Sequence, residues 1–310
     1  MSKEKEQKFA VPVKDLNRTT KGILCIIAAA FGFALMGFFV KLAGNVPVME
    51  KAFFRNAFAA IVAFILIIRE GQGLKIKKGN GRDIFFRCLF GTSGLICNFF
   101  AIEKLGIADA SMLNKLSPFF AILLSIPVLK EKPKKIDILA TVLAFTGALF
   151  IVRPRFDMSV IPGLLGLYGG FGAGFAYVFV RRLGGKGERT SIIVLCFSLF
   201  SCAICVPFAL PVFVMPTPAQ FTCLVMAGLS ATLGQFGITS AYKFAPAKEI
   251  SVFDYTQVIF SALLGIFFLS EIPSLLSIAG YIIIIGTAVM RWRYTLIRDR
   301  RNKEQGEAAT

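Results

Sequence analysis

The chain has 310 residues, of which 56% are hydrophobic and only 17% are charged. Soluble domains carry about 25% charged residues, so this composition excludes a water-soluble globular protein. The sequence contains no histidine, which excludes a Ser-His-Asp triad and a His-ligated metal, and we expect no cofactor and no metal site. A formal net charge of +17 is compatible with a nucleic-acid partner, and the positions of the basic residues decide that question.

Ten apolar runs are long enough to cross a bilayer, which requires about 20 mostly apolar residues. Backbone groups in lipid must be hydrogen bonded within their own segment, and no run alternates as a barrel strand does, so we predict helices. We expect the first run to remain as a helix rather than to be removed as a signal. The prediction is an all-α membrane protein with ten transmembrane helices. The runs are approximately 22–42, 47–68, 84–102, 107–129, 136–152, 161–180, 190–212, 218–242, 247–269 and 274–290.

The basic residues predict how these helices are oriented. Every second connection between the helices carries few basic residues, so these residues gather on one side of the membrane. By the positive-inside rule, that side is cytoplasmic. We therefore predict that the tails 1–21 and 291–310 are both cytoplasmic, in an integral multi-pass protein of the plasma (inner) membrane. Positive charge divided among short segments at membrane ends needs no nucleic-acid partner, so we expect none. The basic segments are both tails and the connections 69–87, 130–135, 181–189 and 243–248.

The sequence also contains a weak internal repeat. A shift of 140 residues places Glu131 on Glu271 and Pro133 on Pro273. Five helices in each copy is an odd number, so the second copy must cross the membrane in the opposite sense. We therefore predict two inverted five-helix repeats, at 22–152 and 161–290. Further matches are Ser111 with Ser251, Ala108 with Lys248 at the helix starts, and Gly147 with Gly286 after a slip of one residue.

Each half ends on an acidic residue and a proline, in Leu-Lys-Glu-Lys-Pro at 129–133 and Leu-Ser-Glu-Ile-Pro at 269–273, followed by a Gly-containing apolar helix. This pattern resembles the EamA family of the drug/metabolite transporter superfamily, over about residues 22–290. Lys130 and Ser270 stand where that family usually has glycine. The resemblance implies a central cavity lined by the first four helices of each half, with the fifth and tenth at the periphery. It also implies movement of metabolites or drugs, often outward.

Three ionisable residues lie well inside the predicted helices, namely Arg55, Lys115 and Asp254. A charge near the centre of a membrane helix costs about 2.5–3.5 kcal/mol on insertion scales, so such residues usually face a cavity or a partner. Arg55, with Asn56 beside it, can hold a substrate carboxylate through two hydrogen bonds. The alternative is that Arg55 extends outward to the membrane surface or forms a structural bridge to Glu50 or Glu103, and the sequence leaves these roles open.

Lys115 and Asp254 fall at near-equivalent places in the two repeats, because the shift aligns Asn114 with Asp254 and Lys115 with Tyr255. We predict that these four residues line the substrate site. Lys115 would hold an acidic group, and Asp254 would hold an amine or carry a coupling proton. The alternative is an internal salt bridge between Lys115 and Asp254 that only fixes the helices.

Four further features complete the candidate site. Pro118 is predicted to kink its helix beside Lys115 and is assigned to gating. Glu103 is a candidate for proton coupling or gating, as is Asp254. Gln235 belongs to a polar stripe that either binds substrate or bonds neighbouring helices. Tyr177 shares a face with glycines at every fourth position, which predicts close helix packing. The stripe comprises Thr232, Gln235, Thr239 and Tyr242, and the glycines are Gly166, Gly170 and Gly174.

The sequence therefore predicts a secondary transporter rather than an enzyme. The preferred substrate is a small polar organic metabolite, an amino acid or related carboxylate, moved by alternating access. An organic cation or drug is the alternative, and an intramembrane lipid-modifying enzyme is a remote one. The Gly-x-x-x-x-Gly-Lys-Ser/Thr signature of ATPases is missing, so coupling would use protons or substrate exchange. We expect a small-molecule substrate and the lipid bilayer as partners, and a monomer or homodimer.

Overall fold

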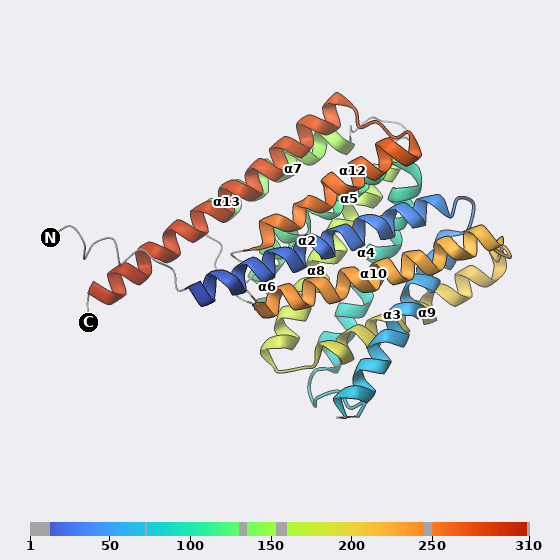
Figure 1. Ribbon diagram of the computed structural model, residues 1–310, viewed down its shortest axis with the longest axis horizontal. Helices are drawn as coiled ribbons and strands as arrows, with labels where there is room; N and C mark the ends of the chain where they lie inside the picture. The colour runs from blue at the N-terminus through green and yellow to red at the C-terminus, as the bar shows by residue number, and fades with distance from the viewer. Residues whose placement is uncertain (1–12, 72, 130–134, 153–159, 245–249, 309–310) are drawn as a thin grey trace.

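The computed structural model describes residues 13–71, 73–129, 135–152, 160–244 and 250–308. All regular elements in these ranges are helices (Figure 1). They supply 10 segments long and apolar enough to cross a membrane, which confirms the prediction of ten transmembrane helices. The elements are α2 (Val13–Leu42), α3 (Val48–Glu70), α4 (Gly81–Lys104), α5 (Ile107–Asn114), α6 (Ser117–Leu129), α7 (Lys135–Val152), α8 (Ile161–Gly185), α9 (Thr190–Ala209), η3 (Leu210–Val212), α10 (Pro218–Phe244), η4 (Ser251–Tyr255), α12 (Thr256–Leu269) and α13 (Leu275–Ala308).

The fourth and ninth predicted helices, 107–129 and 247–269, are each interrupted. The first breaks between α5 and α6 at Lys115 and Leu116, and the second changes from the 3-10 helix η4 to α12 after Tyr255. The first break falls beside Lys115, where a kink was predicted, and Pro118 itself lies two residues after it. Pro118 is in the first turn of α6, where the missing N–H has no helical partner to lose. The interruptions occupy matching places in the two repeats.

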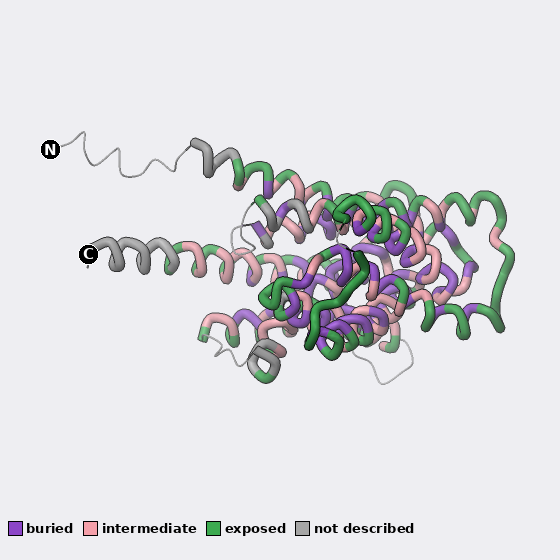
Figure 2. Tube along the Cα trace, turned by 90° about the horizontal axis from the view of Figure 1, so that it is seen from below, coloured by how far each residue is buried: buried purple, intermediate pink, exposed green. Residues whose placement is uncertain are grey.

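Both chain ends leave the bundle at the same end (Figures 1 and 2). We call this the terminal end, and the opposite end, which carries the α2–α3 connection, the distal end. α2 already begins at Val13, and α13 continues to Ala308, so much of the predicted tails 1–21 and 291–310 is helical. Glu131, Pro133 and Lys248, used above to align the repeats, lie outside the described residues.

The helices of the two repeats are interleaved rather than packed as separate halves. α10 lies along α2, α8 along α4, α9 along α3 and α13 along α7, so each pair combines both repeats. Glycines allow this close approach, since a Cβ on Gly172 of α8 would lie 2.7 Å from the Cα of Gly94 in α4. A Cβ on Gly170 would lie 2.5 Å from the carbonyl oxygen of Leu113. α8 is thereby held directly against the interruption between α5 and α6.

Two helix starts at the distal end show why the chain turns there. Thr217 and Gln220 form a capping box before α10, since each backbone N–H donates to the other side chain, at 2.9 and 3.3 Å. Ser274 Oγ accepts from the N–H of Ser277, at 3.1 Å, at the start of α13. Each cap satisfies a backbone donor that the first helical turn leaves without a partner.

Ser270, which follows α12, is the one non-glycine residue of the described ranges with a positive φ, at 55°. A side chain in this left-handed conformation costs about 1 kcal/mol relative to glycine. Ser270→Gly is therefore expected to raise the free energy of unfolding by about 0.5–1 kcal/mol, measured as an increased melting temperature in detergent. Gly71→Ala is the matched control of opposite sign, because Gly71 ends α3 with φ 65° and a Cβ there would touch nothing within 4 Å. A lower melting temperature for Ser270→Gly would contradict the expectation.

Candidate functional site

Lys115 and Asp254 meet where the two interrupted helices face each other. Lys115 Nζ lies 2.5 Å from Asp254 Oδ2, and the two side chains are only 9% and 20% exposed. The hydroxyl of Tyr255 donates to the carbonyl oxygen of Lys115 at 3.1 Å, which satisfies a backbone group freed by the break. The ion pair foreseen as an alternative thus forms in this conformation. Asp254 Oδ1 is buried without a hydrogen-bond partner in the described part of the chain, so it can accept one.

Arg55 is buried in α3 and does not form the bridge to Glu50 or Glu103 that the sequence left open. Its Nη1 donates to Asn56 Oδ1 at 2.7 Å, while Asn56 Nδ2 donates to the carbonyl oxygen of Ala52 at 2.8 Å. Both ends of the Asn56 side-chain amide are therefore bonded within the protein. Asn56 orients the Arg55 guanidinium through its Oδ1 atom. Arg55 Nε has no partner among the residues described.

Arg87 is a residue that sequence reasoning misplaced. It was counted with the basic connection 69–87, but it lies in α4 and is only 9% exposed. Its guanidinium carbon lies 4.2 Å from the ring centroid of Phe197 in α9, and that of Arg55 lies 5.7 Å from the same centroid. The sequence did carry one signal that Arg87 lies inside the bundle, namely Gly91, one helical turn later. A side chain at Gly91 would occupy the space that Arg87 Nη1 fills.

Tyr177 of α8 lies near both the Lys115–Asp254 pair and the two arginines, Arg55 and Arg87. It lies within electrostatic range of Asp254, Arg87 and Arg55, although its side chain is 48% exposed. The glycines on its helix face do serve close packing, as predicted, but Tyr177 itself faces the charged groups.

The remaining predicted residues are less closely grouped. Asn114 is the half-buried last residue of α5, and Pro118 is exposed. Gln235 is half-buried on α10, a helix that packs on α2 and α3. Glu103 lies at the distal end of α4, where it pairs with Lys51. Within the described ranges, no group of three His, Cys, Asp or Glu residues could hold a metal ion.

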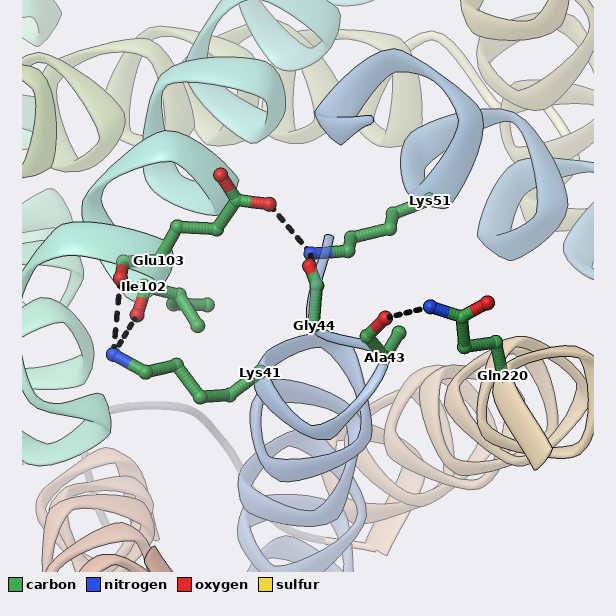
Figure 3. Close-up of polar contacts among 7 residues, drawn as sticks. All are labelled: Lys41, Ala43, Gly44, Lys51, Ile102, Glu103 and Gln220. Atoms are coloured by element: carbon green, nitrogen blue, oxygen red, sulfur yellow. Dashed lines mark hydrogen bonds and ion pairs between the residues drawn. The ribbon is translucent and has the colours of Figure 1, made fainter. Parts of the chain in front are cut away.

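The distal end is held closed by Lys41 and Glu271. Lys41 Nζ donates to the carbonyl oxygens of Ile102 and Glu103 at 2.8 and 3.1 Å (Figure 3). It also donates to the carbonyl oxygen of Leu105 at 2.8 Å and lies 2.8 Å from Glu271 Oε1. The other oxygen, Glu271 Oε2, accepts from the N–H of Ile107 at 2.7 Å. This pair satisfies carbonyls at the end of α4 and an amide at the start of α5. Glu271 of the repeat motif therefore fixes the α4–α5 junction.

A second ion pair adds to this closure. Lys51 is fully enclosed, and its Nζ lies 2.5 Å from Glu103 Oε1 and 2.8 Å from the carbonyl oxygen of Gly44 (Figure 3). Gln220 Nε2 of α10 donates to the carbonyl oxygen of Ala43 at 3.3 Å. A cavity of about 330 Å³ lies beside Glu271, and neither Lys115 nor Arg55 lines it. Its lining residues are Gly106, Ala108, Asp109, Gly265, Ser270, Glu271, Ile272, Pro273 and Tyr281.

The terminal end carries its own polar contacts between α3–α4 and α8–α9. Asp83 Oδ2 lies 2.6 Å from Lys186 Nζ and 3.3 Å from Arg182 Nε. Glu188 Oε2 accepts from Asn80 Nδ2 at 2.7 Å and from the N–H of Lys77 at 3.0 Å. These contacts hold the two connections together, so both ends of the bundle are bridged by charged groups.

Glu188 predicts a pH dependence of stability. Burial opposes its ionisation, but the hydrogen bonds from Asn80, Lys77 and Arg189 outweigh burial and lower the pKa of Glu188 below 4.5. A depressed carboxyl pKa stabilises the fold above the unfolded value, and this stabilisation is lost as pH falls through the folded value. Glu188→Gln is therefore expected to melt below wild type at pH 7 and to converge with it below about pH 4. An equal difference at both pH values would contradict this assignment.

Comparison with known proteins identifies the family. The model of the EamA-like transporter family matches residues 20–153 and again residues 161–292. The chain belongs to the EamA-like transporter family. The two matches coincide with the two predicted repeats, and the chain is thus an integral multi-pass membrane transporter with a small-molecule substrate, not an enzyme.

Several relatives match nearly the whole chain of this EamA-like transporter. The "Pseudopaline exporter CntI" of Pseudomonas aeruginosa (strain UCBPP-PA14) is 31% identical over 273 residues, which cover 87% of this chain and 95% of the relative. The human "Solute carrier family 35 member G1" is 24% identical, covering 87% and 80%. The "Riboflavin transporter" of Brucella anthropi is 23% identical, covering 86% and 97%. A solved crystal structure matches with a TM-score of 0.63 at 16% identity, covering 90% and 98%, which supports the fold.

Proposed function

We propose that the protein is a secondary transporter that moves an amino acid or a related carboxylate by alternating access. The observation that carries this proposal is the ion pair between Lys115 and Asp254. Each partner lies at an interruption of a spanning helix, and the two helices belong to different repeats. Discontinuous helices in inverted repeats are typical of the substrate sites of secondary transporters.

The charges around this pair support a substrate with a carboxylate. Arg55 and Lys115 provide buried cations, and Asp254 Oδ1 is an acceptor without a partner in the described ranges. A zwitterion can place its carboxylate near the cations and its amine near Asp254. An organic cation or drug, the alternative, would approach two buried arginines, and like charges repel strongly where water is scarce.

We also propose a direction, an orientation and a coupling. Export is supported by the similarity to the Pseudopaline exporter CntI. A cytoplasmic terminal end in the plasma (inner) membrane is supported by the basic residues of its tails and connections. Proton coupling or substrate exchange would use Asp254 and Glu103, with Glu103 acting at the distal closure. The working unit is a monomer or a homodimer.

Uptake into liposomes containing the purified protein tests the proposal. Radiolabelled alanine, succinate and tetraethylammonium represent a zwitterion, a dicarboxylate and an organic cation. We expect alanine or succinate to enter faster than tetraethylammonium, and expect Lys115→Ala and Asp254→Ala to remove this flux. Faster entry of tetraethylammonium would contradict the substrate class. Unchanged flux in both variants would contradict the site.

The same liposomes test coupling. An imposed pH gradient is expected to drive accumulation if protons are the coupling ion, whereas preloaded unlabelled solute is expected to accelerate uptake if the protein is an exchanger. Indifference to both conditions would contradict coupled transport. The Glu103→Gln variant is expected to weaken whichever dependence is observed.

A further inference from the structure

Two buried arginines occupy the interior without a counter-charge from the protein. Arg55 of α3 is 4% exposed and Arg87 of α4 is 9% exposed. They lie within electrostatic range of each other and flank the same Phe197 ring, at 5.7 and 4.2 Å from its centroid. Contact with an aromatic face stabilises a cation only modestly. The ring does not offset the burial of two like charges.

The nearby carboxylates do not neutralise this pair in the described part of the chain. The one hydrogen bond of Arg55 goes to the neutral amide of Asn56, and the Nε atoms of both arginines are buried without a partner. Glu103 pairs with Lys51, and Asp83 pairs with Lys186. Glu50, in the first turn of α3, bonds neither arginine. An uncompensated buried cation costs several kcal/mol, so two together favour binding of an anion.

The surroundings of the arginines give such an anion a direction of approach. Gly91 makes room for the Arg87 guanidinium itself, since a Cβ there would be 2.1 Å from Nη1 and 3.0 Å from Phe197 Cε2. Tyr177 presents a half-exposed side chain within range of both arginines and of Asp254. A ligand beside Tyr177 can therefore reach the arginines with one part and Asp254 with another.

We propose that Arg55 and Arg87 together bind a solute bearing two carboxylates. Each guanidinium offers a planar set of donors that matches a carboxylate with two parallel hydrogen bonds. A second carboxylate supplies the second counter-charge that a monocarboxylate lacks. This inference rests on the proposed function and narrows its substrate class to dicarboxylic acids and dicarboxylic amino acids.

Ligand-induced shifts in melting temperature test this proposal, since a ligand stabilises the state to which it binds. The probes are succinate and propionate, titrated into the purified full-length protein. Wild type is expected to bind succinate at least about tenfold more tightly than propionate, because charge-assisted hydrogen bonds are the strong ones. Arg87→Gln is expected to remove this preference. Arg82→Gln is the matched control, because exposed Arg82 also lies over a ring of α4, that of Phe86 at 5.7 Å.

The unliganded variants separate a binding role from a structural one. Neutralising an unpaired buried cation relieves its desolvation cost, so Arg87→Gln without ligand is expected to melt at or above the wild-type temperature. A lower melting temperature together with a retained preference for succinate would mean that Arg87 only packs against Phe197. Equal affinities of wild type for succinate and propionate would also overturn the proposal.

Flux measurements distinguish this failure from failure of the proposed function. Succinate entry at wild-type rate in Arg87→Gln, in liposomes that respond to Asp254→Ala, would overturn the two-arginine site and leave the transporter proposal standing. The opposite combination is also informative. Wild type could prefer succinate in binding and lose this preference in Arg87→Gln, yet move tetraethylammonium faster than alanine and succinate. That result would leave the two-arginine site standing and overturn the proposed substrate class.

Discussion

Replacement of Asp254 with leucine is expected to stop transport and to lower the free energy of unfolding by about 3–5 kcal/mol. The reason is that Lys115, whose side chain is 9% exposed, would keep its buried charge and lose its partner at 2.5 Å. Solute flux in liposomes and denaturant-induced unfolding in detergent measure the two effects separately. Loss of flux with unchanged stability would show that Lys115 already has another counter-charge.

A double variant separates the structural and functional roles of this ion pair. Lys115→Met combined with Asp254→Leu is expected to recover most of the stability and none of the flux, because an apolar pair requires no counter-charge. Lys186→Met is the matched control, since Lys186 is 40% exposed and its partner Asp83 also contacts Arg182. Its loss is expected to cost less than about 1 kcal/mol. Wild-type flux in the double variant would show that the Lys115–Asp254 pair is only a structural bridge.

Glu271→Ala is expected to have the second-largest effect, a loss of about 2–4 kcal/mol and a strong decrease in flux. This carboxylate joins Lys41, at 2.8 Å, to the backbone N–H of Ile107, at 2.7 Å. Without it, Lys41 keeps its carbonyl acceptors, but the start of α5 loses its acceptor. The distal closure then becomes weaker, and the balance between the two states of an alternating-access cycle shifts. Unfolding curves and initial uptake rates measure the two effects.

The conservative Glu271→Gln variant refines this test. It keeps an oxygen for the Ile107 N–H and removes the negative charge facing Lys41, so its stability is expected to lie between wild type and Glu271→Ala. Glu70→Gln is the matched control at the terminal end, where the side chain is 40% exposed and 3.4 Å from Arg189. Equal effects of Glu271→Gln and Glu70→Gln would contradict a specific closure at Glu271.

Much of the fold could be predicted from the sequence because the bilayer imposes simple rules. Length and hydropathy located the ten spans, since each segment must satisfy its own backbone in lipid. The placement of Lys115 and Asp254 at matching points of the repeat gave their ion pair as the alternative to separate substrate contacts, because buried charges are commonly paired. These inferences depend on local composition and on a symmetry that the sequence displays.

Other features depend on three-dimensional proximity, which local composition does not reveal. The helix breaks at Lys115–Leu116 and Tyr255 lack a strong breaker at the break itself, and Pro118 lies two residues after the first of them. Arg87 was counted with a basic connection although the predicted run 84–102 already contains it, because composition alone does not show whether a basic residue near a helix start is buried. The role of Lys41 requires the carbonyls at the end of α4, and backbone acceptors have no sequence signature.

The interleaved packing of the helices has a consequence for biogenesis. α2, α3 and α4 each find their most extensive neighbour in α10, α9 and α8, which are synthesised later. The first repeat must therefore wait in the bilayer, with its glycine surfaces facing lipid, until the second emerges from the ribosome. A chain severed between Val152 and Ile161 would give two fragments that mature only by reassociating with each other. The repeat seen in the sequence is therefore not expected to be an autonomous folding unit.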